Sequence, residues 1–186
     1  MPETRLLRLL ALSLTFSFVA KVHADAPSFA GLEVLDQPVA GPDVSLMDEN
    51  GAIVPLDGAP VTVLNFWATW CAPCVAELPT LLALDEALGD DGLRVVAASL
   101  DRNFAQISGF WSKQGWGDNL DVVLDDKGRF FRSLSAEELG ARGVPYTAIL
   151  NAKGEIVSWY AEETDWASPQ VLAYFEGVLD EASSQR

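Results

Sequence analysis

Two stretches of the chain consist almost entirely of apolar residues and have the pattern of buried strands. Residues 61–67 (VTVLNFW) and 93–100 (LRVVAASL) lack the alternation of a half-exposed strand. Between them, residues 72–88 carry leucines at the spacing of one helical face, and Gly89 follows the last of these leucines. The order strand, helix, strand predicts a unit of a parallel sheet.

Shorter patterns predict the rest of the fold. Hairpins are expected at 43–46 with 53–56 and at 146–150 with 156–160. Helices are expected at 103–114, 135–141 and 168–182, and one further strand at 120–124. Asn103 and Ser168 are predicted N-caps, and Ser135 with Glu138 has the spacing of a capping box. The late hairpin adds antiparallel strands, so the sheet is predicted to be mixed and flanked by helices.

The first 24 residues have the order of a secretory signal peptide. Arg5 and Arg8 precede an apolar run at 9–20, and residues 22–24 (VHA) form a small-x-small site. The run is short for a membrane span of about 20 residues, although an uncleaved N-terminal anchor is the alternative. We therefore expect an exported, periplasmic protein.

The sequence after the predicted signal divides into two parts. Residues 25–41 are mixed in character and contain Pro and Gly, so they are predicted to be a linker or a loosely packed N-terminal arm. Residues 42–186 carry all the predicted strands and helices and are expected to form one domain.

The charge balance narrows the choice of partners. The chain has 27 Asp and Glu against 12 Lys and Arg, and removal of residues 1–24 would change its net charge from −15 to −17. Such a surface repels nucleic acid and anionic lipid, so we expect no nucleic-acid partner. An acidic surface of this kind keeps the protein soluble and could also attract a basic protein.

The only two cysteines, Cys71 and Cys74, form a C-x-x-C pair that could be a redox dithiol, half a zinc site or a structural clip. The only histidine, His23, lies in the predicted signal, so too few ligands remain for zinc, and Cys–His catalysis is excluded. A clip this short stabilises little. The redox dithiol is therefore favoured, with no metal and no cofactor.

The predicted elements assign different roles to the two cysteines. Cys71 falls between a strand and a helix, where the free N–H groups of the helix favour a thiolate that attacks disulfides. Cys74 lies one turn inside the helix, as a resolving thiol would, and Pro73 stiffens the loop between them. Trp67 and Trp70 would form an apolar platform beside the pair, although core packing explains Trp67 equally well.

Glu77 and the Val144-Pro145 pair are two more candidates for the site. Glu77 follows Cys74 by three residues, so it shares a helical face with it and could exchange its proton, although most Glu residues are exposed. Val144-Pro145 directly precedes a predicted strand, where an X-Pro bond could be cis.

The segment WATWCAPCVAELP resembles the active site of TlpA-like thioredoxins, which are exported thiol–disulfide oxidoreductases. The resemblance extends from about residue 42 to the C-terminus and implies an α/β thioredoxin fold with an N-terminal β-hairpin extension. It implies that Cys71 is the nucleophile and Cys74 the resolving cysteine. It also implies that Pro145 is the cis proline that holds the substrate chain, with Val144 before it.

The resemblance also covers the residues around the dithiol. Pro79 matches the proline that kinks the active-site helix, and Glu77 matches a glutamate kept near the cysteines. Asn65 stands where thioredoxin has a buried aspartate, which directs attention to Glu77 as the proton acceptor. Tyr146 departs from the Thr or Glu common after the cis proline.

The function expected from the sequence is reduction of disulfides in exported proteins, including c-type apocytochromes, with electrons from a membrane donor. A dithiol oxidase and a non-catalytic peptide-binding module are the alternatives. A peroxiredoxin is excluded because Asn65 and Thr69 do not fit its P-x-x-x-T-x-x-C pattern.

Overall fold

The structure is a computed structural model, and it describes residues 28–117, 120–135 and 139–184. Among these residues one sheet has eight strands in the order β1-β8-β7-β4-β5-β6-β2-β3. In chain order these are β1 (Glu33–Ala40), β2 (Leu46–Met47), β3 (Ile53–Val54), β4 (Val61–Trp67), β5 (Leu93–Ser99), β6 (Asp121–Leu124), β7 (Tyr146–Asn151) and β8 (Glu155–Tyr160). The predicted signal peptide lies outside the described residues.

The sheet is mixed, as the sequence predicts. Strands β4, β5 and β6 are parallel, whereas β7 pairs with β4 in the antiparallel direction and β8 continues that hairpin. The N-terminal hairpin of β2 and β3 joins the other side through β6. Every residue of β4 is buried, because this strand has a neighbour on each side and packed layers on both faces.

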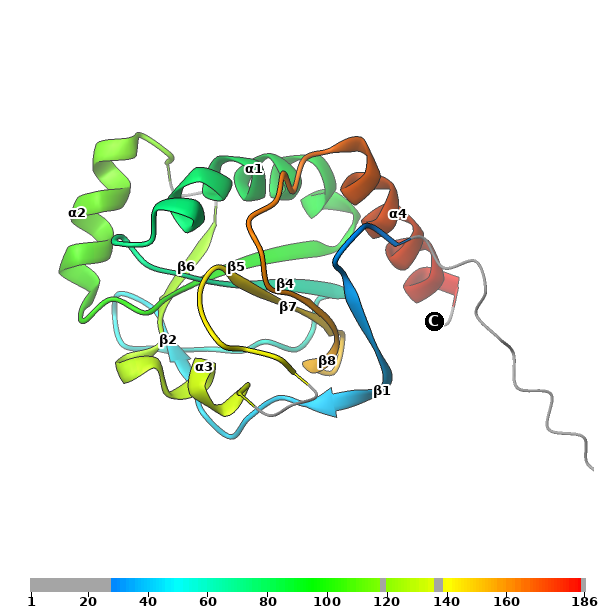
Figure 1. Cartoon of the computed structure of the whole chain (residues 1–186), viewed down its shortest axis with the longest axis horizontal. Coiled ribbons are helices and arrows are strands. Elements are labelled where there is room, and N and C mark those ends of the chain that lie inside the picture. The colour runs from blue at the N-terminus through cyan, green and yellow to red at the C-terminus, as the bar shows by residue number, and fades with distance from the viewer. Residues whose placement is uncertain (1–27, 118–119, 136–138, 185–186) are drawn as a thin grey trace, which may run out of the picture.

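Helices cover both faces of the sheet, as Figure 1 shows. The described helices are α1 (Ala72–Leu88), α2 (Phe104–Gln114), α3 (Arg129–Ser133) and α4 (Pro169–Ser184), with 3₁₀ turns at Gly89–Asp91 and Asp126–Gly128. Residues of α1, α2 and α4 belong to one hydrophobic cluster, and Phe130 of α3 belongs to the cluster on the opposite face. The dithiol lies on the α1 face.

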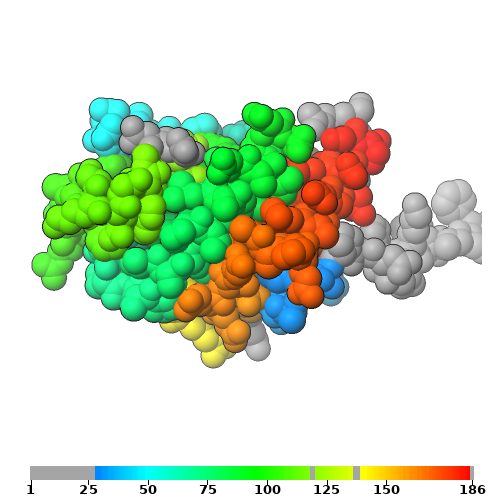
Figure 2. Space-filling view, turned by 90° about the horizontal axis from the view of Figure 1, so that it is seen from above, coloured from blue at the N-terminus to red at the C-terminus, as the bar shows by residue number. Residues whose placement is uncertain are grey.

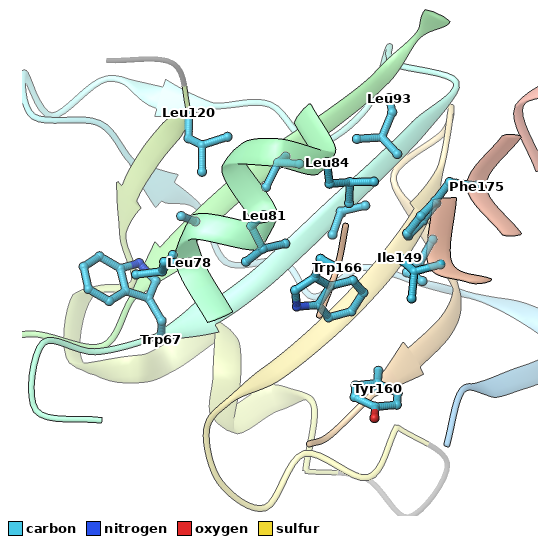
Figure 3. Packing of buried hydrophobic residues seen from close by; sticks show 14 of the residues in the cluster. Trp67, Leu78, Leu81, Leu84, Leu93, Leu120, Ile149, Tyr160, Trp166 and Phe175 are labelled. Carbon is cyan, nitrogen blue, oxygen red and sulfur yellow. The ribbon is translucent and has the colours of Figure 1, made fainter. Parts of the chain in front are cut away.

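Helix α1 is held on the sheet by its leucine face. Leu78, Leu81 and Leu84 are fully buried and, in Figure 3, project from the helix toward the sheet, where Ile149 of β7 lies. Trp166, from the loop after β8, is also fully buried in this cluster. Burying a leucine of this kind contributes about 2 kcal/mol, so the packing of α1 fixes the position of its N-terminus.

The segment predicted as a linker contains a strand. Residues 33–40 form β1, which pairs antiparallel with β8 at the edge of the sheet and has a register irregularity between Val34 and Val39. The strand is mostly exposed and contains Pro38, so its sequence has neither a buried run nor a clean alternation. Its pairing with β8 was not visible in the local pattern.

The short helix before β7 also differs from the prediction. Helix α3 covers residues 129–133, where Asp125 accepts hydrogen bonds from the backbone N–H groups of Phe130 and Phe131. The helix predicted at 135–141 is wrong in its described residues, since Ser135 lies in a turn and Ala141 is not helical. Glu138 of the predicted capping box lies outside the described residues. No helix of the described part has the length and apolar content to span a membrane.

Candidate active site

The dithiol lies where β4 passes into α1. Cys71 is the N-cap of α1, with extended backbone angles, and its sulfur accepts a hydrogen bond from the backbone N–H of Cys74 at 3.3 Å. Pro73 occupies the first turn of the helix, where its missing N–H breaks no helical hydrogen bond. The sulfur of Cys71 thus takes the place of an ordinary capping oxygen and meets the positive end of the helix.

The two cysteines form a disulfide and differ in exposure. Their Cα atoms lie 5.3 Å apart and their sulfurs are bonded. Cys71 is 6% exposed and Cys74 is fully buried, so Cys71 is the sulfur that a partner can reach. The helix N-terminus would stabilise a thiolate at Cys71 after reduction.

The loop before β7 forms the opposite wall of the site. The Val144–Pro145 peptide bond is cis, and the carbonyl oxygen of Val144 lies 3.7 Å from the sulfur of Cys71. Pro145 is buried. The hydroxyl of the next residue, Tyr146, donates to the carbonyl of Leu139 at 2.6 Å, so the side chain after the proline points away from the dithiol into the opposite cluster.

The two predicted platform tryptophans lie in different environments. Trp67 is fully buried, and its ring packs against Trp111 at a centroid distance of 5.7 Å. Trp70 is 68% exposed, directly before Cys71. Only Trp70 can contact a partner at the surface, and Trp67 supports the site from the core.

Glu77 is buried below the dithiol, with 1% of its surface exposed. Its Oε1 accepts a hydrogen bond from Asn65 Nδ2 at 2.7 Å, and its Oε2 accepts one from the backbone N–H of Thr164 at 3.3 Å. Burial raises the pKa of Glu77 from 4.5 to about 7, against the opposing effect of these two hydrogen bonds. The indole N–H of Trp166 also favours the charged form, although it makes no hydrogen bond to any described residue.

Asn65 links β4 to β7 as well as to Glu77. Its Nδ2 also donates to the hydroxyl oxygen of Thr147 at 2.9 Å, and all three side chains are buried. Among the described residues nothing donates to Oδ1 of Asn65. Asn65, Glu77, Thr147 and Thr164, which we call the Glu77 cluster, thus join two strands, a helix and the loop at 161–168. Figure 2 shows this loop (orange) beside α1 (green).

A second buried carboxylate, which the sequence reasoning missed, holds the turn before Cys71. Asp101 is 3% exposed and accepts hydrogen bonds from the backbone N–H of Thr69 at 2.9 Å and from its hydroxyl at 2.8 Å. The hydroxyl of Ser99 donates to Asp101 at 2.8 Å. Asp101, Thr69 and Ser99, which we call the Asp101 cluster, lie at or just after the carboxyl ends of the neighbouring parallel strands β4 and β5, and that position was the available signal.

The described residues offer no metal site, since no three His, Cys, Asp or Glu side chains gather there. The chemistry that this geometry supports is thiol–disulfide exchange. An accessible sulfur lies at a helix N-terminus, a buried sulfur lies beside it, and a buried carboxyl that titrates near neutral pH lies one turn further along the helix.

Comparison with known proteins agrees with this chemistry. The model of the Redoxin family matches residues 30–174. Thiol-disulfide oxidoreductase ResA of Bacillus subtilis is 28% identical over 131 residues, which cover 69% of each chain. Thiol:disulfide interchange protein DsbE of Haemophilus influenzae is 30% identical over 165 residues, which cover 84% of each chain.

A solved structure supports the fold. The thiol:disulfide interchange protein DsbE from Chlorobium tepidum is similar with a TM-score of 0.62 and 24% identity, over 80% of this chain and 98% of that one. The chain therefore belongs to the Redoxin family and is a thiol–disulfide oxidoreductase of the TlpA-like type, with a thioredoxin fold.

Proposed function

We propose that this protein is exported to the periplasm and reduces disulfides of other exported proteins. The observation that carries the proposal is the unequal exposure of the two cysteines at the start of α1, with Cys71 6% exposed and Cys74 fully buried. This arrangement suits a nucleophile that meets a protein partner and a resolving thiol that meets only the mixed disulfide. The N-terminal signal pattern supports export.

The reaction transfers two electrons from the dithiol to the partner. The thiolate of Cys71 attacks one sulfur of the partner disulfide, which forms a mixed disulfide and releases the other partner sulfur as a thiolate that takes up a proton. Cys74 then loses its proton and attacks the sulfur of Cys71. The partner leaves as a dithiol, and the Cys71–Cys74 disulfide remains.

Glu77 is the proposed acceptor for the proton of Cys74. It is buried on the same face of α1, one turn beyond Cys74, and its pKa of about 7 lets it take or release a proton at neutral pH. Asn65 cannot serve, because its amide does not titrate. Trp70, exposed beside Cys71, and the cis bond at Val144–Pro145 are the proposed contacts for the partner chain.

The mechanism is tested by trapping. A Cys74→Ala variant should hold its partner on Cys71 as a mixed disulfide that a thiol reductant releases, and the Cys71→Ser/Cys74→Ala double variant is the matched control. Reduction of a model disulfide by Cys71→Ser at the normal rate would overturn the assignment. If both cysteines can be removed with no loss of partner binding or phenotype, the protein is a binding module instead.

The direction of the reaction is tested by redox titration against glutathione. Strong oxidants owe their potential to a very stable thiolate, and Ala72-Pro73 between the cysteines supplies no histidine to stabilise one. We expect a potential closer to about −270 mV than to −120 mV, and a value well above about −180 mV would favour the oxidase. A reductase in an oxidising compartment needs a membrane electron donor.

Apocytochromes of the c type are the first substrates to test, because the TlpA-like resemblance includes reductases of cytochrome c maturation. The partner recovered from the Cys74→Ala trap identifies the substrate directly. Recovery of unrelated exported proteins, with no apocytochrome among them, would favour general disulfide reduction. Tyr146 stands after the cis proline, where members that act in cytochrome c maturation often carry Glu, so the choice between apocytochromes and other substrates needs this experiment.

A further inference from the structure

The amide of Asn65 is the only direct side-chain link between Glu77 and the sheet among the described residues. Its Nδ2 donates to Glu77 Oε1 at 2.7 Å and to Thr147 Oγ1 at 2.9 Å, while Oδ1 has no partner in the described part of the chain. Asn65 is fully buried. The amide therefore presents both of its N–H groups to oxygen atoms, which fits a charged Glu77.

A neutral Glu77 does not fit this arrangement. Its two hydrogen-bond neighbours, the amide N–H of Asn65 and the backbone N–H of Thr164, are donors only, so in this orientation neither can accept from a protonated carboxyl group. A proton that points at either of them would set two donors against each other, and one that points elsewhere would gain no hydrogen bond from them. Because burial brings the pKa of Glu77 to about 7, the neutral form is nevertheless well populated at neutral pH.

We propose that the Asn65 amide reverses when Glu77 binds a proton, so that Oδ1 replaces Nδ2 between Glu77 and Thr147. The terminal torsion of Asn is close to two-fold, and the reversed amide occupies the same space. Its Oδ1 accepts from the carboxyl group of Glu77 and from the hydroxyl of Thr147, which can donate as well as accept. On the other side no hydrogen bond to a described residue is broken, and the two N–H groups take the place of Oδ1, so the two bonds that Oδ1 gains must outweigh the cost of leaving them without described acceptors.

This proposal explains why an amide suits position 65. A carboxylate there would repel a charged Glu77, and an apolar side chain could neither donate to the charged form nor accept from the neutral one. Asn65 can match both protonation states of Glu77. It is therefore a positioning residue that acts on the proton of Glu77 rather than on the reacting sulfurs.

Groups on the loop after β8 and on α1 also bear on the protonation of Glu77. Glu163, exposed on the loop after β8, favours the neutral form by charge repulsion, whereas the backbone N–H of Thr164 and the indole N–H of Trp166 favour the charged form. On α1, Cys71 and Cys74 do not titrate while they form the disulfide. The role of the reversal in catalysis rests on the proposed proton transfer from Cys74, but the reversal itself can be measured in the oxidised protein.

The test is an NMR titration of the oxidised full-length protein. The ¹³Cδ signal of Glu77 gives its midpoint, and nuclear Overhauser contacts between the Asn65 side-chain amide protons and the Thr147 methyl group report the amide orientation. We expect these contacts to be strong above the Glu77 midpoint and several-fold weaker below it. Contacts of constant strength through the midpoint would overturn the reversal. In Glu77→Gln, the control, the contacts should not change with pH.

Two variants separate the reversal from its catalytic role. Asn65→Leu removes the donor to charged Glu77 and also the acceptor for neutral Glu77. Because a hydrogen bond to the charged form is about twice as strong, the midpoint should still rise, by up to about one pH unit, a tenfold change in proton affinity, whereas Thr147→Val should shift it less. Release of a trapped partner by Cys74 should shift to higher pH in parallel, with attack by Cys71 unchanged. A moved midpoint beside an unmoved release profile would overturn the proton role of Glu77 and leave the reversal intact. An unmoved midpoint in Asn65→Leu would overturn the role of Asn65 in setting the proton affinity of Glu77, and the reversal itself is decided by the nuclear Overhauser contacts.

Discussion

Two buried carboxylates lie near the dithiol, and they are bound in different ways. Asp101 accepts three hydrogen bonds, two from Thr69 and one from Ser99, and its own backbone N–H donates back to Ser99. Glu77 accepts only two, from Asn65 and from the backbone of Thr164. Both side chains are almost fully buried, so exposure does not distinguish them.

The difference lies in where the donors come from and how many there are. Two of the donors of Asp101 belong to the turn that leads into Cys71, so this carboxylate fixes the backbone of the active site. The donors of Glu77 compensate only part of the cost of burying its charge, so its pKa rises to about 7. One carboxylate is suited to shaping the site, and the other is suited to holding a proton in it.

Removal of Asp101 should cause the largest loss of stability. Asp101→Ala leaves the N–H and hydroxyl of Thr69 and the hydroxyl of Ser99 without their acceptor, and we expect the free energy of unfolding to fall by on the order of 4 kcal/mol. Urea denaturation of the oxidised protein measures this loss. Asp101→Asn keeps the shape and one acceptor, so it should lose about half as much. A loss below about 1 kcal/mol in Asp101→Ala would contradict a structural role.

Removal of the Glu77 charge should change the pH dependence of stability. The pKa of Glu77 is higher in the folded protein, about 7, than its ordinary value of 4.5, so the folded state holds this proton more tightly. Stability from this group is therefore complete below about pH 4.5 and is lost as the pH rises to about 7, by about 3 kcal/mol in all. The Glu77→Gln variant should lack this part of the pH dependence of stability, and above pH 7 it should be more stable than the unmodified protein.

The measurement compares urea unfolding of the two oxidised proteins between pH 5 and pH 8. Asp85, whose pKa is also raised by burial, titrates in both proteins and cancels in the difference. The same slope in both proteins would show that Glu77 is charged across this range, and it would remove the contrast with Asp101.

Elements with a strong local pattern were predicted well from the sequence. Strand β4 and helix α1 begin and end at the predicted residues, because a continuous apolar run and a leucine face followed by a glycine are local signals. The position of Cys71 at the start of α1 followed from the same boundary. The cis bond at Pro145 agrees with the TlpA-like resemblance, whereas spacing alone left it open.

Features that depend on distant contacts were not predicted. Strand β1 is defined by its pairing with β8, more than 100 residues later, and its own residues are mostly exposed and show no regular alternation. The Asp101 cluster depends on the parallel register that places Ser99 beside Trp67. The burial of Glu77 depends on the loop after β8, which closes over α1, and a single helix gives no sign of such a cover.

Removing a hydrogen bond that anchors the loop at 161–168 to α1 should have a smaller effect on stability, and this effect should not depend on the charge of Glu77. Thr80, one turn further along α1, accepts a hydrogen bond from the backbone N–H of Trp166 at 3.0 Å. Thr80→Val should lower the free energy of unfolding by about 1 kcal/mol, and by the same amount at pH 5 and pH 8, because no titrating group is removed. Thr80→Ser keeps the hydroxyl and serves as the control. If Thr80→Val instead cut the pH slope by half or more, the loop would be what keeps water from Glu77. The proton site would then depend on the loop as well as on α1 and the sheet.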